Sequence, residues 1–400
     1  MHDTGKMPDA GSSIQLWIYR KPLLLGTCFL LSVLVITFGL QANLKLAGLF
    51  ILGILLGITL LKSAFGFSAA YRRAFLYRDL RAVKAQILML LLGTFLVVPV
   101  LANGSIFGHG VSGAFAPFGL QVIAGAFLFG LGMQLGGGCG SGTLFTLGGG
   151  SPRMLITLIA FIAGSFWASL HMYWWWKLPS LPTISLGKSI GWGNAFFAQA
   201  LVLFVLFIFM KKWHKPQPGQ TPPENNTGWL QGLLLNPWNI YVGAMLLALL
   251  NWMTLLIAGH PWSITWGFTL WGAKTASLLG WDAAHSSFWS GGFQQSALNG
   301  PLLHDTTSLM NVGIILGAFL AAVLSNRFAP RFSIPPASFA AAVTGGLAMG
   351  YGARIGFGCN IGAFFSGVIS TSMHGWLWIL AALAGTWSGI KLRPVFKLDN

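Results

Sequence analysis

The sequence predicts an all-α integral membrane protein, with about ten transmembrane helices in two inverted halves and interrupted, re-entrant short helices beside a narrow central path. Three observations support this fold class. Of the 400 residues, 55% are hydrophobic and only 8% are charged, whereas a soluble domain carries about 25% charged residues. Apolar runs of the roughly 20 residues that cross a bilayer recur along the chain. Two glycine-rich stretches, one in each half of the sequence, repeat one another.

The apolar runs define the expected spans, and the basic residues between them define the orientation. We expect spans near 22–42, 46–62, 85–103, 117–137, 154–176, 193–210, 238–258, 309–326, 339–357 and 375–391. Lysines and arginines gather in the loops that fall on one side when ten spans alternate. Because cytoplasmic loops carry an excess of Lys and Arg, both termini are expected in the cytoplasm.

The same pattern divides the chain into four parts. Residues 1–44 are expected to form a tail with an additional transmembrane helix, and 45–211 the first half of the bundle. Residues 212–235, rich in Pro, Gly and Asn, suit a cytoplasmic linker. Residues 236–400 would then form the second half. Within it, 260–305 is rich in Gly, Ser and Trp, which favours short helices or a re-entrant loop over a span.

The repeated stretches cover 125–145 and 345–365. At an offset of 220 residues, which is the separation between Cys139 and Cys359, six glycines of the two copies coincide. Such self-similarity indicates a duplication. With ten alternating spans, the two copies cross the membrane in opposite directions. Inverted repeats with interrupted helices near the midplane are typical of transporters.

Each copy contains a break at its cysteine. Glycine costs up to about 1 kcal/mol in a helix interior, so each helix is expected to unwind at the cysteine and restart near Ser141 or Asn360. A restarting helix presents unpaired N–H groups and the positive end of its dipole, which together bind anions. The residues expected along this path are Gly138, Cys139, Ser141, Thr143, Gly358, Cys359 and Asn360.

A plainer interpretation of the same residues stays open. The glycines would let helices pack closely, and the cysteines would be small apolar side chains within that packing. Cys28 has no counterpart in the repeat and is expected to be structural. Arg354 lies five residues before Cys359, where it either draws an anion inward or extends to the membrane surface.

The polar composition excludes several function classes. None of the seven acidic residues lies in an expected span, which argues against a carboxylate-based proton carrier or hydrolase.

Three cysteines do not indicate a disulfide framework or a structural zinc site, and we expect no metal and no cofactor. The net charge of +16 resides at span ends, so it indicates topology and contact with the lipid bilayer rather than nucleic-acid binding.

At three stretches the chain resembles the YeeE/YedE family of bacterial inner-membrane sulfur-transport proteins. They are 137–142 (GGCGSG), 358–362 (GCNIG) and 65–73 (FGFSAAYRR), and the resemblance covers most of the chain from about residue 45. It implies import of thiosulfate along cysteine thiols at a narrow waist, with Cys139 and Cys359 as thiol donors on the path. It also implies location in the inner membrane. Because the sequence shows no acid–base or metal site, we expect a transporter rather than an enzyme.

The sequence departs from the family at one position. The third stretch of the family normally carries a cysteine after its phenylalanine, and here that residue is Gly66. Either Ser68 replaces the missing thiol as a donor, or the substrate differs. The leading hypothesis is therefore an importer of thiosulfate or a related sulfur or selenium anion. The alternatives are a membrane thiol or persulfide redox enzyme, and a scaffold that delivers sulfur to a cytoplasmic carrier protein docked on the basic 72–84 loop.

Overall fold

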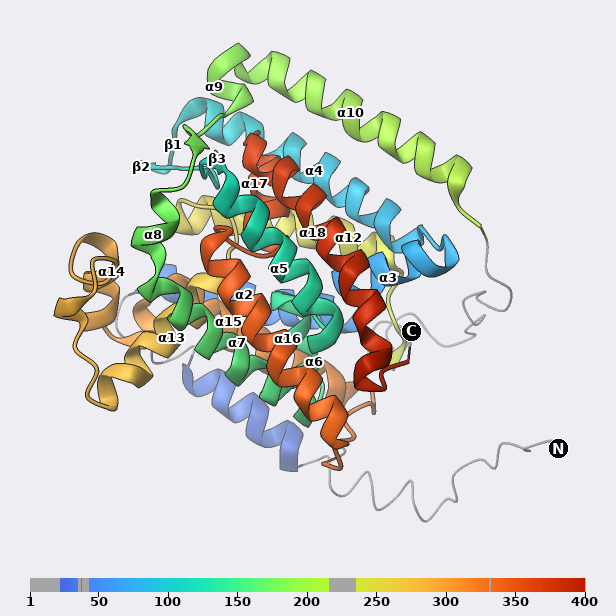
Figure 1. Cartoon of the computed structure of the whole chain (residues 1–400), viewed down its shortest axis with the longest axis vertical. Helices are drawn as coiled ribbons and strands as arrows, with labels where there is room; N and C mark the ends of the chain where they lie inside the picture. Colours follow the sequence, from blue (N-terminus) through green and yellow to red (C-terminus); the bar gives the residue numbers. More distant parts are fainter. Residues whose placement is uncertain (1–21, 35–36, 38–42, 216–234, 331, 400) are drawn as a thin grey trace.

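A computed structural model shows a bundle of helices with almost no β-structure (Figure 1). It describes residues 22–34, 37, 43–215, 235–330 and 332–399. The N-terminal tail, part of the first expected span (22–42) and most of the expected linker (212–235) lie outside these residues. An apolar helix over Pro22–Leu34 is the described part of that first span.

The helices up to residue 215 carry the first cysteine stretch. In chain order they are α2 (Leu44–Lys62), α3 (Phe67–Tyr77), α4 (Arg81–Asn103), α5 (Leu120–Gly136), α6 (Gly140–Gly148), α7 (Pro152–Leu170), α8 (Met172–Trp176), α9 (Leu186–Ile190) and α10 (Trp192–Trp213). Two short antiparallel pairs join the loops on one side, namely β1 (Ser105–Ile106) with β2 (His109–Gly110), and β3 (Phe118–Gly119) with β4 (Ser180–Leu181).

The helices after residue 235 carry the second cysteine stretch. They are α12 (Ile240–Ala258), α13 (Thr265–Leu278), η1 (Ala283–His285), α14 (Gly292–Asn299), η2 (Leu302–His304), α15 (Thr306–Leu324), α16 (Pro336–Ile355), η3 (Asn360–Phe365), α17 (Ser366–Ile369), α18 (Met373–Leu392) and η4 (Arg393–Phe396). Residues 260–305 thus form short helices, which Figure 1 shows at the periphery around α13 and α14.

Seven helical segments of the described chain are long and apolar enough to cross a membrane. They contain α2 with α3, α4, α5 with α6, α7, α10, α12 and α15. The expected spans at 339–357 and 375–391 also fall on helices, α16 and α18, each of 20 residues. The glycine and polar residues of α16 and α18 lower their mean hydropathy, so these two helices are not among the seven apolar segments. The count of ten spans therefore stays a prediction.

The two repeated helices, α5 and α16, pack against each other through their glycines. A Cβ added to Gly125 would lie 2.4 Å from the backbone N of Gly356, and one added to Gly345 would lie 2.2 Å from the backbone N of Gly136. Gly345 and Gly356 are the counterparts of Gly125 and Gly136 at the offset of 220. The contact therefore maps onto itself when the copies are exchanged, as at a twofold axis.

The flanking helices repeat the same arrangement. Gly130 of α5 packs on α18, where an added Cβ would lie 2.0 Å from the Ala382 carbonyl oxygen. Its counterpart Gly350 of α16 packs on α7, where an added Cβ would lie 2.1 Å from the Phe161 carbonyl oxygen. Backbones approach this closely only at small residues. The four helices α7, α16, α5 and α18 thus form one tightly packed layer at the centre of the bundle.

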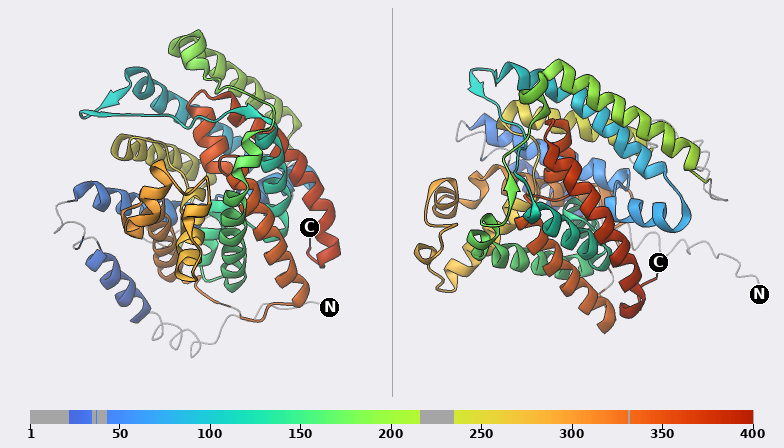
Figure 2. Two further views of the ribbon diagram at one scale, coloured as in Figure 1. Left: turned by 60° about the vertical axis from the view of Figure 1, so that its left-hand side comes forward. Right: turned by 45° about the horizontal axis from the view of Figure 1, so that its top comes forward.

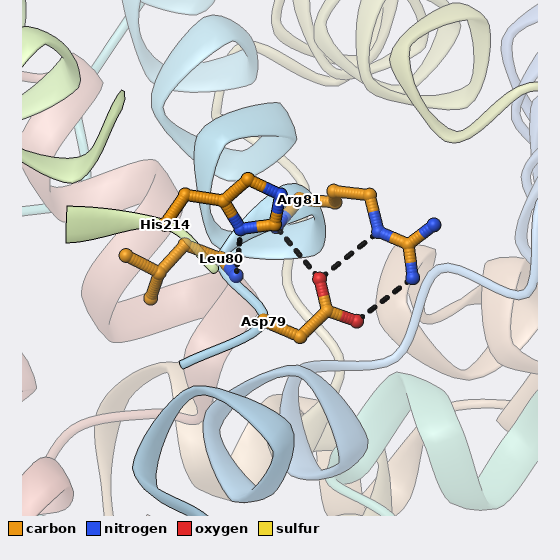
Figure 3. Close-up of polar contacts among 4 residues, drawn as sticks. All are labelled: Asp79, Leu80, Arg81 and His214. Carbon is orange, nitrogen blue, oxygen red and sulfur yellow. Dashed lines mark hydrogen bonds and ion pairs between the residues drawn. The ribbon is translucent and has the colours of Figure 1, made fainter. Parts of the chain in front are cut away.

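Helix α10 lies on the outside, beside α4 (Figure 2). Its C-terminal end is fixed to the loop between α3 and α4, as Figure 3 shows: the backbone N–H of Leu80 donates to His214 Nδ1 at 3.1 Å. In the same loop, Arg81 donates two hydrogen bonds to the Asp79 carboxylate, at 3.0 and 2.9 Å. These bonds hold the pKa of Asp79 below its usual range, against the opposing effect of burial.

Candidate functional site

The first cysteine stands at a break between two helices. α5 ends at Gly136, and Gly137 turns the chain in a left-handed conformation at φ +88°, which glycine adopts without strain. Arg153 donates to the carbonyl oxygens of Leu135 and Gly136, at 2.6 and 2.7 Å, and so satisfies the exposed end of α5. The break and the restart at residue 140 agree with the sequence prediction.

Cys139 is the N-cap of α6, and its side chain is buried. Its Sγ accepts a hydrogen bond from the Gly142 backbone N–H at 3.4 Å and lies 3.3 Å from Ser141 Oγ. Thr143 Oγ1 donates to the Cys139 carbonyl oxygen at 2.9 Å, so both Ser141 and Thr143 lie beside the cysteine, and the Thr143 hydroxyl hydrogen is used within the helix. The thiol is thereby held at the positive end of α6.

The second cysteine stands at an equivalent break. After α16 the chain turns at Phe357, with φ +61°, and at Gly358, with φ +150°. A left-handed phenylalanine is an uncommon conformation that the surroundings must enforce. Cys359 then precedes η3, which is a π-helix, a rare form found mostly at functional sites. Cys359 and Asn360 are both fully buried.

Gly138 and Gly358 play the same role at the two breaks. A Cβ on Gly138 would lie 3.1 Å from the backbone N of Thr143, and one on Gly358 would lie 2.7 Å from the backbone N of Ala363. The glycines therefore allow the chain to fold back onto the first turn of the next helix. This explains physically why glycine precedes each cysteine.

The two breaks face each other. A Cβ added to Gly140, the residue after Cys139, would lie 3.2 Å from Cys359 Sγ. The structure thus brings the two thiols into one buried region, although 220 residues separate them in the sequence. We call Cys139, Gly140, Cys359, Asn360 and Tyr71 the cysteine site.

Tyr71 of α3 belongs to this site and escaped the sequence prediction. Its hydroxyl lies near the Asn360 side chain and Cys139. The Tyr71 hydroxyl interacts with the Asn360 side chain, but neither this hydroxyl nor the two amide atoms of Asn360, all buried, make a hydrogen bond of good geometry in the described structure. An unsatisfied buried polar group costs about 1–3 kcal/mol. These three atoms give the cysteine site unused hydrogen-bonding capacity, and other buried atoms without a partner, such as Gln199 Oε1 and Asn251 Nδ2, lie elsewhere in the described structure.

Gly66 and Ser68 lie at the start of α3. A Cβ on Gly66 would meet only the Ala64 carbonyl oxygen, 4.0 Å away, so the position is open. Ser68 Oγ donates to the Met133 carbonyl oxygen at 2.8 Å, and the Gln134 amide donates to the Ser68 carbonyl oxygen at 3.0 Å. Because its hydroxyl hydrogen is used in this contact, Ser68 secures α3 against α5 and is poorly placed to replace a thiol donor.

Arg354 lines a cavity of about 290 Å³, and neither Cys139 nor Cys359 is among the residues that line it. Its guanidinium carbon is 5.1 Å from the centre of the Phe288 ring, and its buried Nε has no hydrogen-bond partner among the described residues. Ser263 and Phe357 line this cavity and also a neighbouring one of about 190 Å³ that reaches Gly362. The arginine therefore borders a polar approach to the second break.

The start of α13 is a further element that sequence reasoning missed. The loop before it is fixed by Asn251, whose side chain accepts from the Trp262 backbone N–H at 2.7 Å, and by Asn311, whose amide donates to the Ile264 carbonyl oxygen at 2.9 Å. A Cβ on Gly362 would lie 3.4 Å from Ser263 Oγ. The only sequence signal for Ser263 was its place in the Gly-, Ser- and Trp-rich segment.

The chemical character of the site follows from what these residues offer. The thiols, the Tyr71 hydroxyl and the Asn360 amide are neutral groups that can donate hydrogen bonds to an anion. The thiol sulfur atoms can also contact a sulfur atom of that anion. In the part of the chain that the structure describes, no three His, Cys, Asp or Glu side chains are grouped to hold a metal ion. The arrangement suits recognition of a small anion.

Apolar helices, a self-complementary repeat and facing breaks at two buried thiols define a multi-pass membrane protein of the transporter class. A family model for sulphur transport matches residues 62–388. The chain therefore belongs to this family, the YeeE/YedE family.

Relatives with curated names agree with this membership. The chain is 27% identical to the thiosulfate transporter TsuA of Spirochaeta thermophila over 84% of this chain and 96% of that protein. It is 26% identical to TsuA of Escherichia coli over 88% of this chain and 96% of that protein. A probable transporter YedE of Salmonella typhimurium is 35% identical over 36% of this chain. That match spans only 35% of the YedE length.

Proposed function

We propose that the protein imports a sulfur-containing anion, thiosulfate or a close sulfur or selenium relative, across the bacterial inner membrane. The observation that carries this proposal is the approach of Cys359 Sγ to Gly140, beside Cys139, at two facing helix breaks. The membership of the sulphur transport family and the similarity to TsuA proteins support it.

The proposed path has two chemical components. The thiols of Cys139 and Cys359 donate weak S–H hydrogen bonds to the soft sulfur end of the anion. Tyr71, Asn360 and the N–H groups at the starts of α6 and η3 contact its oxygen atoms. Because each contact is weak and neutral, the anion can leave again, as conduction requires. Arg354 attracts the anion toward the path without binding it tightly.

The remaining sequence predictions belong to this proposal. Residues 45–211 and 236–400 form two inverted halves with re-entrant short helices, joined by the 212–235 linker, and both termini are cytoplasmic. A cytoplasmic sulfur-carrier protein would receive the anion's sulfur on the side of the basic 72–84 loop. The repeated packing of α5 on α16 supports the inverted relation.

The proposal is tested by uptake of labelled thiosulfate into cells that lack other thiosulfate and sulfate importers. We expect Cys139→Ala and Cys359→Ala each to lower uptake at least about tenfold, since each removes a contact worth about 1.4 kcal/mol or more. Cys28→Ala is the matched control, because Cys28 is exposed and remote from the repeat. Undiminished uptake by well-expressed Cys139→Ala and Cys359→Ala variants would refute the thiol path.

The purified wild-type protein addresses the enzymatic alternative, with the two alanine variants as controls. In a persulfide enzyme the thiolate of Cys139 or Cys359 would attack the outer sulfur of thiosulfate and displace sulfite, which leaves one additional sulfur atom on the cysteine, whereas a transporter would keep both thiols free. Intact-protein mass spectrometry distinguishes the two outcomes by a covalent mass increase of one sulfur.

A further inference from the structure

A second cavity, separate from the cysteine site, has the composition of an anion site. It measures about 470 Å³ and lies among the ends of α2, α6, α7, α15 and α16. Its lining includes the cations Lys62, Arg153 and Arg327, and its described lining residues include no carboxylate. We call it the basic cavity.

Two of these cations are held in place by neutral oxygen atoms. Lys62 is only 5% exposed, and its Nζ donates to Ser325 Oγ at 3.0 Å. Arg153 donates through Nε to Ser338 Oγ at 2.8 Å, in addition to its contacts with the end of α5. The acceptors of Arg153 are neutral oxygen atoms, which fix the position of this side chain but do not cancel its charge.

The third cation adds to the positive potential. Arg327 is exposed and lines the cavity together with Lys62. Like charges gathered at the edge of a low-dielectric region repel one another, and an anion between them reduces this repulsion. The geometry therefore favours occupancy by a negative ion.

Two long helices also begin at the basic cavity. α7 starts at Pro152 after Ser151, and α16 starts at Pro336 after Pro335; neither N-cap side chain bonds to its helix. Ser151, Pro152 and Pro335 line the cavity together with the three cations. Prolines have no N–H to donate, and the Ser151 N–H already donates to the Thr146 carbonyl oxygen, so the two helix starts contribute the positive ends of their dipoles rather than hydrogen bonds.

We propose that the basic cavity binds a small oxyanion of the sulfate, thiosulfate or phosphate class, at a site distinct from the cysteine site. The cavity contacts the C-terminal end of α6 and the residues after it. Cys139 caps the opposite end of this nine-residue helix, so about 13 Å separates the two sites along its axis. In the context of the proposed function, on which this role rests, the cavity holds the anion on the side of the basic loops after it has passed the thiols.

The test is the binding of inorganic sulfate to the full-length protein in nanodiscs of neutral phosphatidylcholine, measured by calorimetry at low ionic strength. We expect Arg327→Gln to weaken binding about tenfold, as loss of a charge-assisted contact does. Arg73→Gln is the matched control, because Arg73 is also exposed and does not line the cavity. We expect it to stay within about twofold of the wild type, since a remote exposed charge is screened.

A Cys139→Ala, Cys359→Ala double variant separates the two sites. Sulfate binding that persists in this variant and weakens in Arg327→Gln supports the basic cavity. Equal affinities of Arg327→Gln and Arg73→Gln, or loss of sulfate binding in the cysteine double variant, would overturn it. Failure of the wild type to take up thiosulfate would instead refute the proposed function and leave the sulfate measurement valid.

A phosphate group of a lipid could supply the same chemistry as a free anion. The measurement is therefore repeated in nanodiscs that contain phosphatidylglycerol. Displacement of sulfate by phosphatidylglycerol in the wild type, with no such competition in Arg327→Gln, would assign the same oxyanion site to a lipid headgroup. Unchanged sulfate affinity in the wild type would assign it to the free ion.

Discussion

At the scale of single residues, Tyr71 gives the cysteine site its sharpest test. Its buried hydroxyl lies beside the Asn360 side chain but makes no hydrogen bond of good geometry in the described structure, so it adds little to the stability of the empty protein. Tyr71→Phe should therefore leave thermal stability unchanged or slightly higher, because it removes an unsatisfied polar group. The same change should raise the KM for thiosulfate about tenfold, since a hydrogen bond to an anion is worth about 1.5–3 kcal/mol.

Uptake kinetics and thermal unfolding of the same preparations check this prediction. Tyr241→Phe is the control, because Tyr241 stands at the start of α12 and is only half-buried. An unchanged KM in Tyr71→Phe would remove Tyr71 from the path. A lower unfolding temperature would show that its hydroxyl has a structural role instead.

The residue scale also shows where the sequence was informative. Cys139 and Cys359 could be found because a duplication leaves equal spacing, and their glycines could be explained by backbone geometry alone. Tyr71 could not be found from the sequence, because its role depends on a contact between α3 and η3. Positions 71 and 360 are 289 residues apart in the chain. The use of the Ser68 hydroxyl by Met133 was hidden for the same reason.

At the scale of elements, the contact between α5 and α16 depends on its glycines. Gly345→Ala would place a methyl group 2.2 Å from the backbone N of Gly136. Since backbone on the facing helix cannot yield cheaply, we expect a loss of about 1–3 kcal/mol of stability, typical of overpacking. Thermal unfolding in detergent measures the effect.

The control for this prediction is the same substitution where space is open. An added Cβ at Gly193 of α10 meets nothing within 4 Å, so Gly193→Ala should be neutral or stabilise by up to about 1 kcal/mol through helix propensity. If Gly345→Ala were as stable as Gly193→Ala, the close packing of α5 on α16 would be wrong.

The elements themselves were predicted unevenly. Long apolar runs located the helices, and glycine density located both breaks. The π-helix η3 and the left-handed Phe357 had no local signal, because tertiary contacts impose both conformations. The segment 260–305 gave only an ambiguous signal, because its helices are short. Its buried tryptophans also contact distant residues: Trp289 Nε1, for example, donates to Ser169 Oγ at 2.9 Å.

A prediction about pH concerns the loop between α3 and α4. Arg81 lowers the pKa of Asp79 through its hydrogen bonds, so the folded state favours the charged carboxylate. This stabilisation is complete above the ordinary aspartate pKa of about 3.9 and is lost as the pH falls below it. Asp79→Asn should lower the free energy of unfolding by about 1–2 kcal/mol at pH 7. This is the loss expected when an ion pair is broken that is largely buried but still in partial contact with water.

The difference between wild type and Asp79→Asn should shrink as the pH falls from 5 toward 3, in thermal unfolding followed by tryptophan fluorescence. Asp282→Asn is the control, because the Asp282 side chain is 63% exposed and lies 3.7 Å from His285 in a surface pair. A constant difference between Asp79→Asn and wild type at all pH values would exclude titration of Asp79 as its cause.

At the scale of the whole molecule, the sequence indicated the membrane class, the duplication and the family. It did not reveal that the two copies contact each other directly, since spacing alone does not specify which helices are neighbours. The structure supplies this relation through Gly125 with Gly356 and Gly136 with Gly345. The site consequently lies where the copies meet, and each copy contributes one thiol.

The glycine contact between α5 and α16 has a consequence for movement. Surfaces that leave no room for a methyl group cannot slide far past one another without steric collision, and separating them would lose the close van der Waals packing that holds helices together in a membrane. Large rocking motions, in which one half tilts against its twin, would break this seam first. We therefore expect passage to depend on rotation of a few side chains within a stationary frame, as in a gated pore, rather than on a carrier that alternates its opening between two faces.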